Sequence, residues 1–251
     1  MKSKGKGLIS QGLIPDWLDK IFLGSVFPLI KFFSSVKINP NWLTLLGFVQ
    51  NIIAACFIVV EKFLVGGLFI VVAGIFDFID GKVAAKTKST TKYGAVLDSI
   101  LDRYSDIVIY LGIILYYQRN NYDISLIVTV IAIVGSVMTS YIKAIGESYG
   151  VEFRMGVLRR QERITLICVG LVFTFLNQGI VNILRDIAGF LRISLGDIPI
   201  MPLTLIIYFL AIFTNFSAIQ RFIMLRKITK SGNEQQKNKV ENDRFDSENR
   251  R

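Results

Sequence analysis

The chain has 251 residues, of which 52% are hydrophobic and 19% charged, and its net charge is +10. This composition excludes an ordinary soluble domain, and a basic nucleic-acid-binding domain with it, so the positive charge indicates membrane topology and lipid headgroups. There is no histidine, and Cys56 and Cys168 both fall within apolar runs, which disfavours a disulfide or a cysteine metal cluster. We therefore expect an all-α integral membrane protein.

The first 38 residues are expected to form a cytoplasmic N-terminal segment with one amphipathic helix. Within it, residues 15–33 mix charged and aromatic residues, and Pro28 interrupts the run. These polar residues favour a helix that lies on the membrane surface over an additional membrane span.

Six apolar runs follow, each close to the roughly 20 residues that a spanning helix needs. They cover residues 42–60, 63–79, 95–117, 124–145, 163–184 and 200–224. We expect these six transmembrane helices to form one membrane domain over residues 39–228. Residues 229–251 are polar and mixed in charge, which is typical of a disordered cytoplasmic tail.

Lysine and arginine are distributed unevenly over the segments between the spans. Of the 29, most lie within residues 1–41, 80–104, 143–163 and 221–251. The alternate connections hold Lys62, Arg119, Arg185 and Arg192. By the positive-inside rule both termini and the loop after the second span face the cytoplasm, in the cell membrane if the source is prokaryotic.

Four aspartates lie where the second span ends and the third begins: Asp77, Asp80, Asp98 and Asp102. The members of each pair are three or four residues apart, so each pair can share one face of its helix. Four carboxylates at one depth repel one another unless cations lie between them, and oxygen ligands select Mg²⁺, Mn²⁺ or Ca²⁺ over zinc. Because two such ions can clamp phosphoryl oxygens, the pattern predicts a two-metal site for phosphoryl chemistry.

Small residues accompany the aspartates, namely Gly81, Ala84, Ala85, Gly94 and Ala95. They let a ligand or another helix approach the backbone closely. In the alternative interpretation the aspartates cap helices and pair with the nearby Lys82, Lys86, Lys88, Lys92 and Arg103. For Asp106 or Asp123 taken singly, we prefer that alternative.

The aspartate spacing resembles the signature of the CDP-alcohol phosphotransferases. The matching motifs are Asp77-x-x-Asp80-Gly81-x-x-Ala84 and Gly94-x-x-x-Asp98-x-x-x-Asp102, with Pro40-Asn41-Trp42-Leu43-Thr44 upstream resembling the family's Pro-Asn-x-x-Thr. The resemblance extends over about residues 35–226. One position departs from the family pattern, because Ala85 stands where the family usually has arginine, which puts the rate or the nucleotide affinity in doubt.

The resemblance implies an enzyme of phospholipid biosynthesis that transfers a phosphatidyl or archaetidyl group from a CDP-linked lipid to an alcohol and releases CMP. By position, two divalent cations, Mg²⁺ or Mn²⁺, would be held by Asp77, Asp80, Asp98 and Asp102, and Asp102 would also be the catalytic base. The nucleotide end of the donor would bind at Asn41, Thr44, Asp80, Gly81, Ala84 and Gly94. The family also tends to form homodimers.

Two further stretches, SYIKAIGESYG at 140–150 and GVLRRQER at 156–163, resemble the phosphatidylinositol-phosphate synthase branch. The matching residues are Lys143, Glu147, Gly156, Arg160 and Arg163, with Arg221 in the last span. This resemblance implies an inositol phosphate acceptor bound by Lys143, Arg160, Arg163 and Arg221, since arginine and lysine suit a phosphomonoester. Glycerol 3-phosphate or free inositol stays open as the acceptor, and so does a plain anchoring role for these cations in lipid headgroups.

Two other classes of protein were compared with the enzyme. A cation channel or transporter would spread acidic residues along the membrane depth. After Asp106 the next carboxylates are Asp123, at an outer end, and Glu147, so this class is disfavoured. A non-catalytic relative, suggested by Ala85 alone, stays open.

Overall fold

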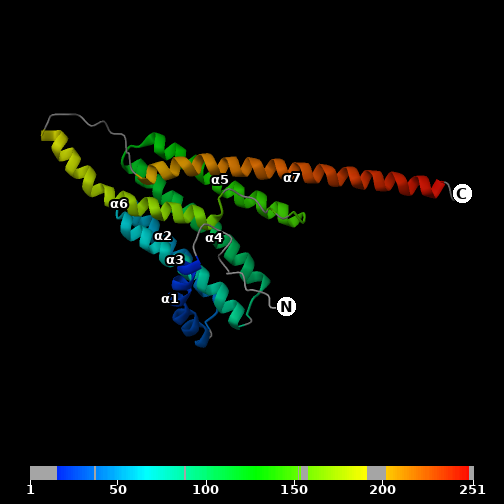
Figure 1. The fold of residues 1–251 in the computed structure, drawn as a ribbon, viewed down its shortest axis with the longest axis horizontal. Coiled ribbons are helices and arrows are strands. Elements are labelled where there is room, and N and C mark those ends of the chain that lie inside the picture. The colour runs from blue at the N-terminus through cyan, green and yellow to red at the C-terminus, as the bar shows by residue number, and fades with distance from the viewer. Residues whose placement is uncertain are drawn as a thin grey trace.

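The structure, a computed structural model, describes residues 16–36, 38–87, 89–151, 153, 158–190 and 202–248 (Figure 1). The regular elements of these residues are seven helices. They are α1 (Asp16–Ser35), α2 (Pro40–Val59), α3 (Phe63–Thr87), α4 (Lys92–Arg119), α5 (Asp123–Ser148), α6 (Arg160–Phe190) and α7 (Pro202–Glu248). The prediction of an all-α fold is confirmed.

Four of these helices are long and apolar enough to cross a membrane: α2, α3, α5 and the part of α7 from Pro202 to Thr229. Six spans were predicted. The other two predicted spans, 95–117 and 163–184, also lie within helices, α4 and α6. The first half of α4 carries Asp98, Asp102, Arg103 and Asp106, and α6 begins with Arg160, Glu162 and Arg163, which lowers the hydropathy of both helices. The side chains of α6 are described only as far as residue 177.

The helices form a bundle in which α2 packs against α3 and α4, while α5 packs against α7. Helix α6 contacts both α3 and α7, and α4 contacts α5, so the two groups join into one body. The hydrophobic core contains Phe63, Tyr116 and Tyr117, with the Phe63 and Tyr116 rings meeting edge to face at 5.0 Å between centroids. The Tyr117 hydroxyl lies 2.9 Å from Thr204 Oγ1, a hydrogen bond between α4 and α7.

Small residues allow these helices to approach closely. A Cβ on Gly47 of α2 would lie 3.3 Å from the carbonyl oxygen of Ala73 in α3 and 4.0 Å from the backbone nitrogen of Asp77. A Cβ on Gly112 of α4 would lie 2.8 Å from Ala55 Cα in α2. Close backbone contact therefore sets where α3 and α4 stand relative to α2.

The α5–α7 seam is the contact formed by Gly135 and Thr139 of α5 with Thr214 and Asn215 of α7. A Cβ on Gly135 would clash with the Thr214 hydroxyl and the Asn215 side chain. Thr139 Oγ1 donates to the Thr214 carbonyl at 3.0 Å, and Asn215 Nδ2 donates to the Ile131 carbonyl at 2.9 Å. The seam is a tight contact between neutral polar groups.

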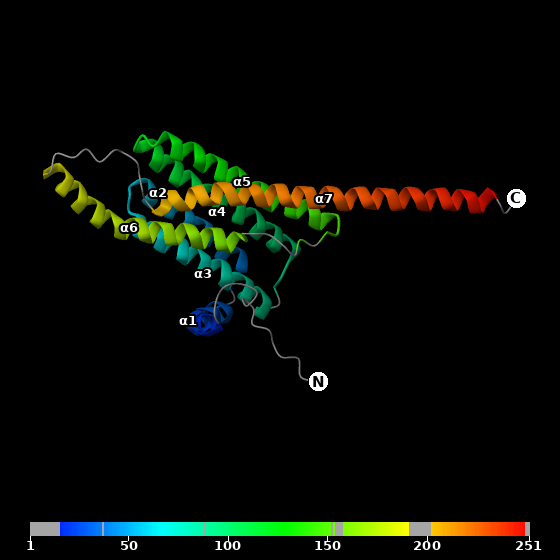
Figure 2. The same ribbon diagram turned by 45° about the horizontal axis from the view of Figure 1, so that its top comes forward.

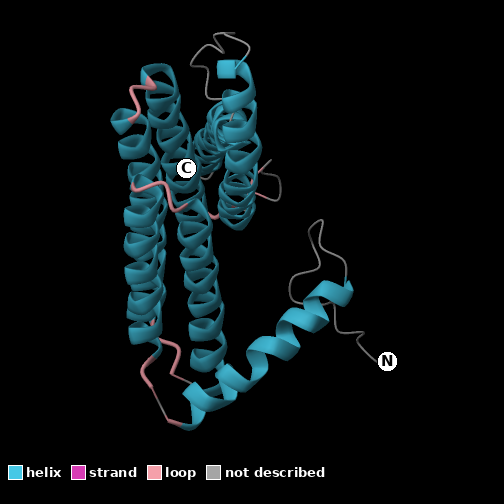
Figure 3. Ribbon diagram, turned by 90° about the vertical axis from the view of Figure 1, so that its left-hand side faces the viewer, coloured by secondary structure: helices cyan, strands magenta, loops and turns pink. Residues whose placement is uncertain are grey.

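Helix α1 contacts α3 and projects away from the bundle, as Figures 2 and 3 show. Val26 and Ile30 pack on a small cluster that includes Ile79 and Val83 of α3. Phe27 and Phe32 are 60% and 59% exposed. An exposed aromatic face of this kind fits the predicted position on a membrane surface, which stays a prediction.

Helix α7 runs far beyond the bundle (Figure 1) and reaches Glu248. The tail predicted as disordered from residue 229 is thus helical in the structure up to that residue. Its composition explains the difference, because residues 229–248 are rich in Glu, Gln and Lys, which are good helix formers.

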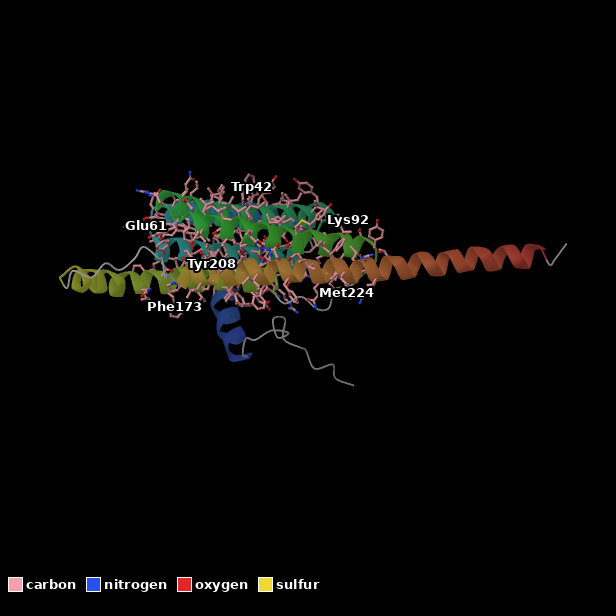
Figure 4. All side chains as sticks on the ribbon, turned by 90° about the horizontal axis from the view of Figure 1, so that it is seen from above. Trp42, Glu61, Lys92, Phe173, Tyr208 and Met224 are labelled. Atoms are coloured by element: carbon pink, nitrogen blue, oxygen red, sulfur yellow. The ribbon has the colours of Figure 1, made fainter. Side chains whose placement is uncertain are left out.

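Glu61, in the turn from α2 to α3, and Lys92, at the start of α4, lie at opposite ends of the bundle (Figure 4). Glu61 has a φ of 64°, which lets a short turn connect the two helices. The aspartates on α3 and α4 lie toward the Lys92 end, where α3 ends and α4 begins.

Candidate active site

Two helix caps bring the first turns of α2 and α4 to this end of the bundle. The Asn39 side chain accepts a hydrogen bond from the Asn41 backbone at 3.0 Å, with Pro40 in the first helical turn. Thr91 Oγ1 accepts from the Gly94 backbone at 2.9 Å. A Cβ on Gly94 would lie 3.1 Å from Asn41 Oδ1, so the glycine allows the two helix starts to touch.

Three of the predicted aspartates converge. Asp77 of α3 and Asp98 and Asp102 of α4 each present a carboxylate oxygen, and these three oxygens lie within 4.8 Å of one another. All three residues are half-buried. Asp98 Oδ1 is fully buried and has no hydrogen-bond partner among the described residues.

Asp80, the fourth predicted aspartate, lies beside this cluster and not within it. It is only 7% exposed, and its Oδ2 accepts a hydrogen bond from Thr44 Oγ1 of α2 at 2.6 Å. Gly81 next to it is exposed, with open space where a Cβ would stand. Ala84 is half-buried one turn further along α3.

Arg160 begins α6 and reaches into the aspartate cluster. Its Nη1 lies 2.7 Å from Asp102 Oδ1 and 3.8 Å from Asp77 Oδ1. Its Nε donates to Asp106 Oδ1 at 3.1 Å. The sequence assigned Arg160 to an acceptor pocket, and the structure brings it into direct contact with two of the predicted metal ligands.

Arg163, one turn further along α6, is buried with 2% exposure. Its Nη2 donates to Asp106 Oδ2 at 3.2 Å, and its Nη1 donates to the Leu158 carbonyl at 3.3 Å. Asp106 is itself 5% exposed, so one buried carboxylate holds two arginines. Sequence reasoning expected Asp106 to pair with nearby cations; the four-residue spacing from Asp98 through Asp102 to Asp106 was the signal that could have tied it to the site.

The remaining acceptor candidates lie on α5 and α7. Lys143 is exposed and pairs with Glu147 at 3.5 Å. Arg221 is 8% exposed, and its Nη1 donates to the Thr139 carbonyl at 2.9 Å. Arg221 also interacts electrostatically with Arg163 and Glu147, so these charges extend from the aspartate cluster toward α5 and α7. Gly156, named for the same loop, lies outside the described residues.

Residues 37–195, which include all four aspartates, match the sequence profile described as CDP-alcohol phosphatidyltransferase. The chain belongs to the CDP-alcohol phosphatidyltransferase family. The family resemblance carried by the aspartate motif is thereby confirmed, and the protein is a transferase of phospholipid synthesis.

Relatives of this CDP-alcohol phosphatidyltransferase bear more specific names. Archaetidylinositol phosphate synthase of Pyrococcus horikoshii is 32% identical over 151 residues, which are 60% of this chain and 78% of that protein. Phosphatidylinositol phosphate synthase of Corynebacterium glutamicum is 32% identical over 157 residues, 59% of this chain and 69% of that protein.

The fold also matches solved structures. The crystal structure of Mycobacterium tuberculosis phosphatidylinositol phosphate synthase with CDP-DAG bound matches with a TM-score of 0.64 and 24% identity, over 80% of this chain and 92% of that chain. A second structure of that enzyme, in complex with manganese and citrate, matches with the same TM-score. This likeness establishes a shared fold. The four helices that are long and apolar enough to cross a membrane are consistent with an integral membrane protein.

Proposed function

We propose that this enzyme transfers a phosphatidyl or archaetidyl group from a CDP-linked lipid to an inositol phosphate and releases CMP. The observation that carries the proposal is the convergence of Asp77, Asp98 and Asp102 oxygens within 4.8 Å in a member of the CDP-alcohol phosphatidyltransferase family. The names of the relatives, archaetidylinositol phosphate synthase and phosphatidylinositol phosphate synthase, support the acceptor.

The aspartates Asp77, Asp80, Asp98 and Asp102 would hold two divalent cations, Mg²⁺ or Mn²⁺. The fit rests on the buried, unpartnered Asp98 Oδ1 and on a ligand set made only of oxygen. Manganese in the mycobacterial enzyme supports the same choice of ion. Such cations would offset the pyrophosphate charge and stabilise the charge that develops on CMP.

Asp102 would take the proton from the acceptor hydroxyl, because the chain has no histidine and this carboxylate stands in the cluster. As the proton leaves, the acceptor oxygen forms a bond to the phosphorus that carries the lipid, and the bond from that phosphorus to the CMP oxygen breaks. The salt bridge from Arg160 Nη1 to Asp102 Oδ1, 2.7 Å long, would orient the carboxylate for this step.

The nucleotide end of the donor would bind where α2, α3 and α4 begin or end together. Asn41 and Thr44 lie beside Gly94 and Asp80, and the backbone at Gly81 is open to an approaching ligand. Ala84 would leave room for the cytidine. The family arginine is replaced by the exposed Ala85. The nearby Lys82, whose ammonium lies over the Phe78 ring at 5.3 Å from its centroid, would supply a point charge instead of a planar guanidinium.

The acceptor phosphate would bind to four cations on α5, α6 and α7. They are Lys143, Arg160, Arg163 and Arg221. Two of them, Arg160 and Arg163, also hold Asp106, and Arg221 is near Arg163. The alternative is the same chemistry with glycerol 3-phosphate or free inositol as the acceptor. Free inositol carries no phosphate, so its binding would need fewer cations.

The arrangement in the membrane belongs to the proposal as well. Residues 39–228 would form one membrane domain with six spans. Its aspartate end would face the cytoplasm, because the connections at that end carry most of the lysine and arginine. Helix α1 would lie on the same membrane surface. We expect a homodimer, as is usual in the family.

The test uses purified full-length protein with radiolabelled CDP-diacylglycerol or CDP-archaeol and a panel of acceptors. We expect CMP release that depends on inositol phosphate and on Mg²⁺ or Mn²⁺, and that stops on chelation with EDTA. Stimulation by glycerol 3-phosphate alone would replace the inositol acceptor by the alternative. No CMP release with any acceptor and either metal would refute the proposed function.

A further inference from the structure

Asp106 links the buried interior of the bundle to the aspartate cluster through two arginines. Its Oδ2 accepts from Arg163 Nη2 at 3.2 Å and its Oδ1 accepts from Arg160 Nε at 3.1 Å. Arg163 is fixed in turn by the Leu158 carbonyl at 3.3 Å. Arg160 and Arg163 are three residues apart on α6 and so share one face of the helix. The carboxylate therefore fixes α4 against α6 and sets the direction of the Arg160 guanidinium.

The position of Arg160 matters because it is a permanent cation at the edge of a cluster that fits divalent cations. Its Nη1 is 2.7 Å from Asp102 Oδ1 but 3.8 Å from Asp77 Oδ1. It thus pairs closely with one carboxylate of the cluster and only loosely with the second. Outside the cluster, Arg160 is bound by Asp106, which accepts a hydrogen bond from the guanidinium Nε.

We propose that Asp106 is a positioning residue that holds Arg160 at the edge of the Asp77–Asp98–Asp102 cluster and thereby prevents its guanidinium from competing with a divalent cation there. Without the Asp106 carboxylate, the ion pairs that Arg160 keeps with described residues are those with Asp102 and Asp77, both within the cluster. A guanidinium that moves between them neutralises two of the three carboxylates and opposes the ion. Asp106 thus sets the affinity of the cluster for divalent cations without touching them.

The inference rests on the proposed function, because it concerns the cations that the three aspartates would hold. The probe is Mn²⁺ itself, titrated into the purified full-length protein and followed by the electron paramagnetic resonance signal of free Mn²⁺. Asp106→Asn keeps the shape of the side chain and removes its charge. We expect the Kd for Mn²⁺ to rise about tenfold or more, as is typical when a residue that orients metal ligands is replaced.

Two further variants guard against misfolding and against a simple charge effect. Asp106→Asn leaves the buried Arg163 without its carboxylate partner, which destabilises the fold. The double variant Asp106→Asn, Arg163→Gln removes that unpaired charge. It is expected to show the same loss of affinity for Mn²⁺. Asp123→Asn makes the same change in charge at the exposed start of α5, and its Kd for Mn²⁺ should equal that of the wild type.

The decisive comparison repeats Asp106→Asn in an Arg160→Gln background. If Asp106 acts by holding Arg160, most of its effect on the Kd disappears once the competing cation is gone. An undiminished loss in that background, or a Kd within twofold of the wild type for the folded variants, overturns the inference and leaves the proposed function intact. Failure of the wild-type protein to bind Mn²⁺ overturns both the inference about Asp106 and the proposed function. The two kinds of failure can therefore be told apart.

Discussion

At the end of the bundle where α3, α4 and α6 meet, the polar groups between the helices are charged. The side chains that form the α5–α7 seam are neutral, and the charged Arg221 contacts the seam through the Thr139 carbonyl. The charged end holds Asp102, Asp106 and Arg160 in salt bridges of 2.7 and 3.1 Å. In the seam, Thr139 and Asn215 donate to backbone carbonyls of the facing helix at 3.0 and 2.9 Å. Both regions lie between helices of one bundle, so location alone does not explain the difference.

The difference lies in the charge of the groups that are left without a partner. Ser217 Oγ on α7 is also buried without a hydrogen-bond partner among the described residues, but it is a neutral hydroxyl. The Thr139 and Asn215 donors each have an acceptor in the facing helix, so those contacts serve the association of α5 with α7. At the charged end, Asp98 Oδ1 is buried without a partner among the described residues. A buried carboxylate oxygen without a partner costs more than an unpaired hydroxyl, and a bound ligand offsets that cost. Changes at the two regions should therefore separate activity from stability.

The largest effect is expected for Asp98→Ala. Because the carboxylate is a ligand and not a packing group, CMP release should fall about 10³-fold, as for loss of a group that stabilises transition-state charge. The thermal unfolding midpoint in detergent should stay at the wild-type value, as it should for Asp123→Ala. A variant that released CMP normally would remove the aspartates from the chemistry.

The next effect is a loss of stability at the seam. In Gly135→Ala, the added Cβ meets the Thr214 hydroxyl and the Asn215 side chain, and such overpacking costs about 1–3 kcal/mol of unfolding free energy. Gly74→Ala is the matched control, since nothing lies within 4 Å of that position. Denaturation in detergent measures both variants. Equal stability of the two would mean that the seam is looser than its contacts indicate.

A smaller loss of activity is expected for Thr44→Val. This change keeps the shape of the side chain but removes the 2.6 Å hydrogen bond to Asp80. Bonds to charged groups contribute about 1.5–3 kcal/mol, so the specific activity should fall about tenfold while the protein stays folded. Unchanged kcat and unchanged donor KM would show that the position of Asp80 does not depend on α2.

The smallest effect is expected for Tyr117→Phe, which removes the hydrogen bond to Thr204 between α4 and α7. Polar contacts between membrane helices contribute on average about 0.6 kcal/mol, so the unfolding midpoint should fall slightly. CMP release per folded protein should be unaltered. A strong loss of activity in Tyr117→Phe would show that the neutral contacts of the core also affect catalysis at the charged end. The separation of stability from activity would then be wrong.

Much of the fold could be predicted, because long apolar runs leave few alternatives in a membrane. Four predicted spans coincide with α2, α3, α5 and α7. Composition misled at the tail, where the polar residues after 229 were expected to be disordered although Glu, Gln and Lys also favour helix. The start of α4 at Lys92 depends on its cap, Thr91, a local signal that hydropathy alone does not contain.

The site was predictable only where the residues are close in sequence or follow a motif. The spacing of Asp77, Asp98 and Asp102 indicated that they would meet. That Asp80 turns to Thr44, and that Arg160 reaches Asp102, depends on how α2 and α6 pack against α3 and α4. These contacts join residues 36 or more positions apart, and no helical period carries that information.

The glycine at position 47 has a consequence for genetics. It lies in the middle of α2, carries no reactive group, and is buried where a side chain would press on the Ala73 carbonyl and the backbone nitrogen of Asp77. In a random-mutagenesis screen for cells that lose the lipid product, we expect bulky replacements at this glycine to be recovered beside those of the aspartates. Such alleles would resemble active-site lesions although the altered residue never meets a substrate.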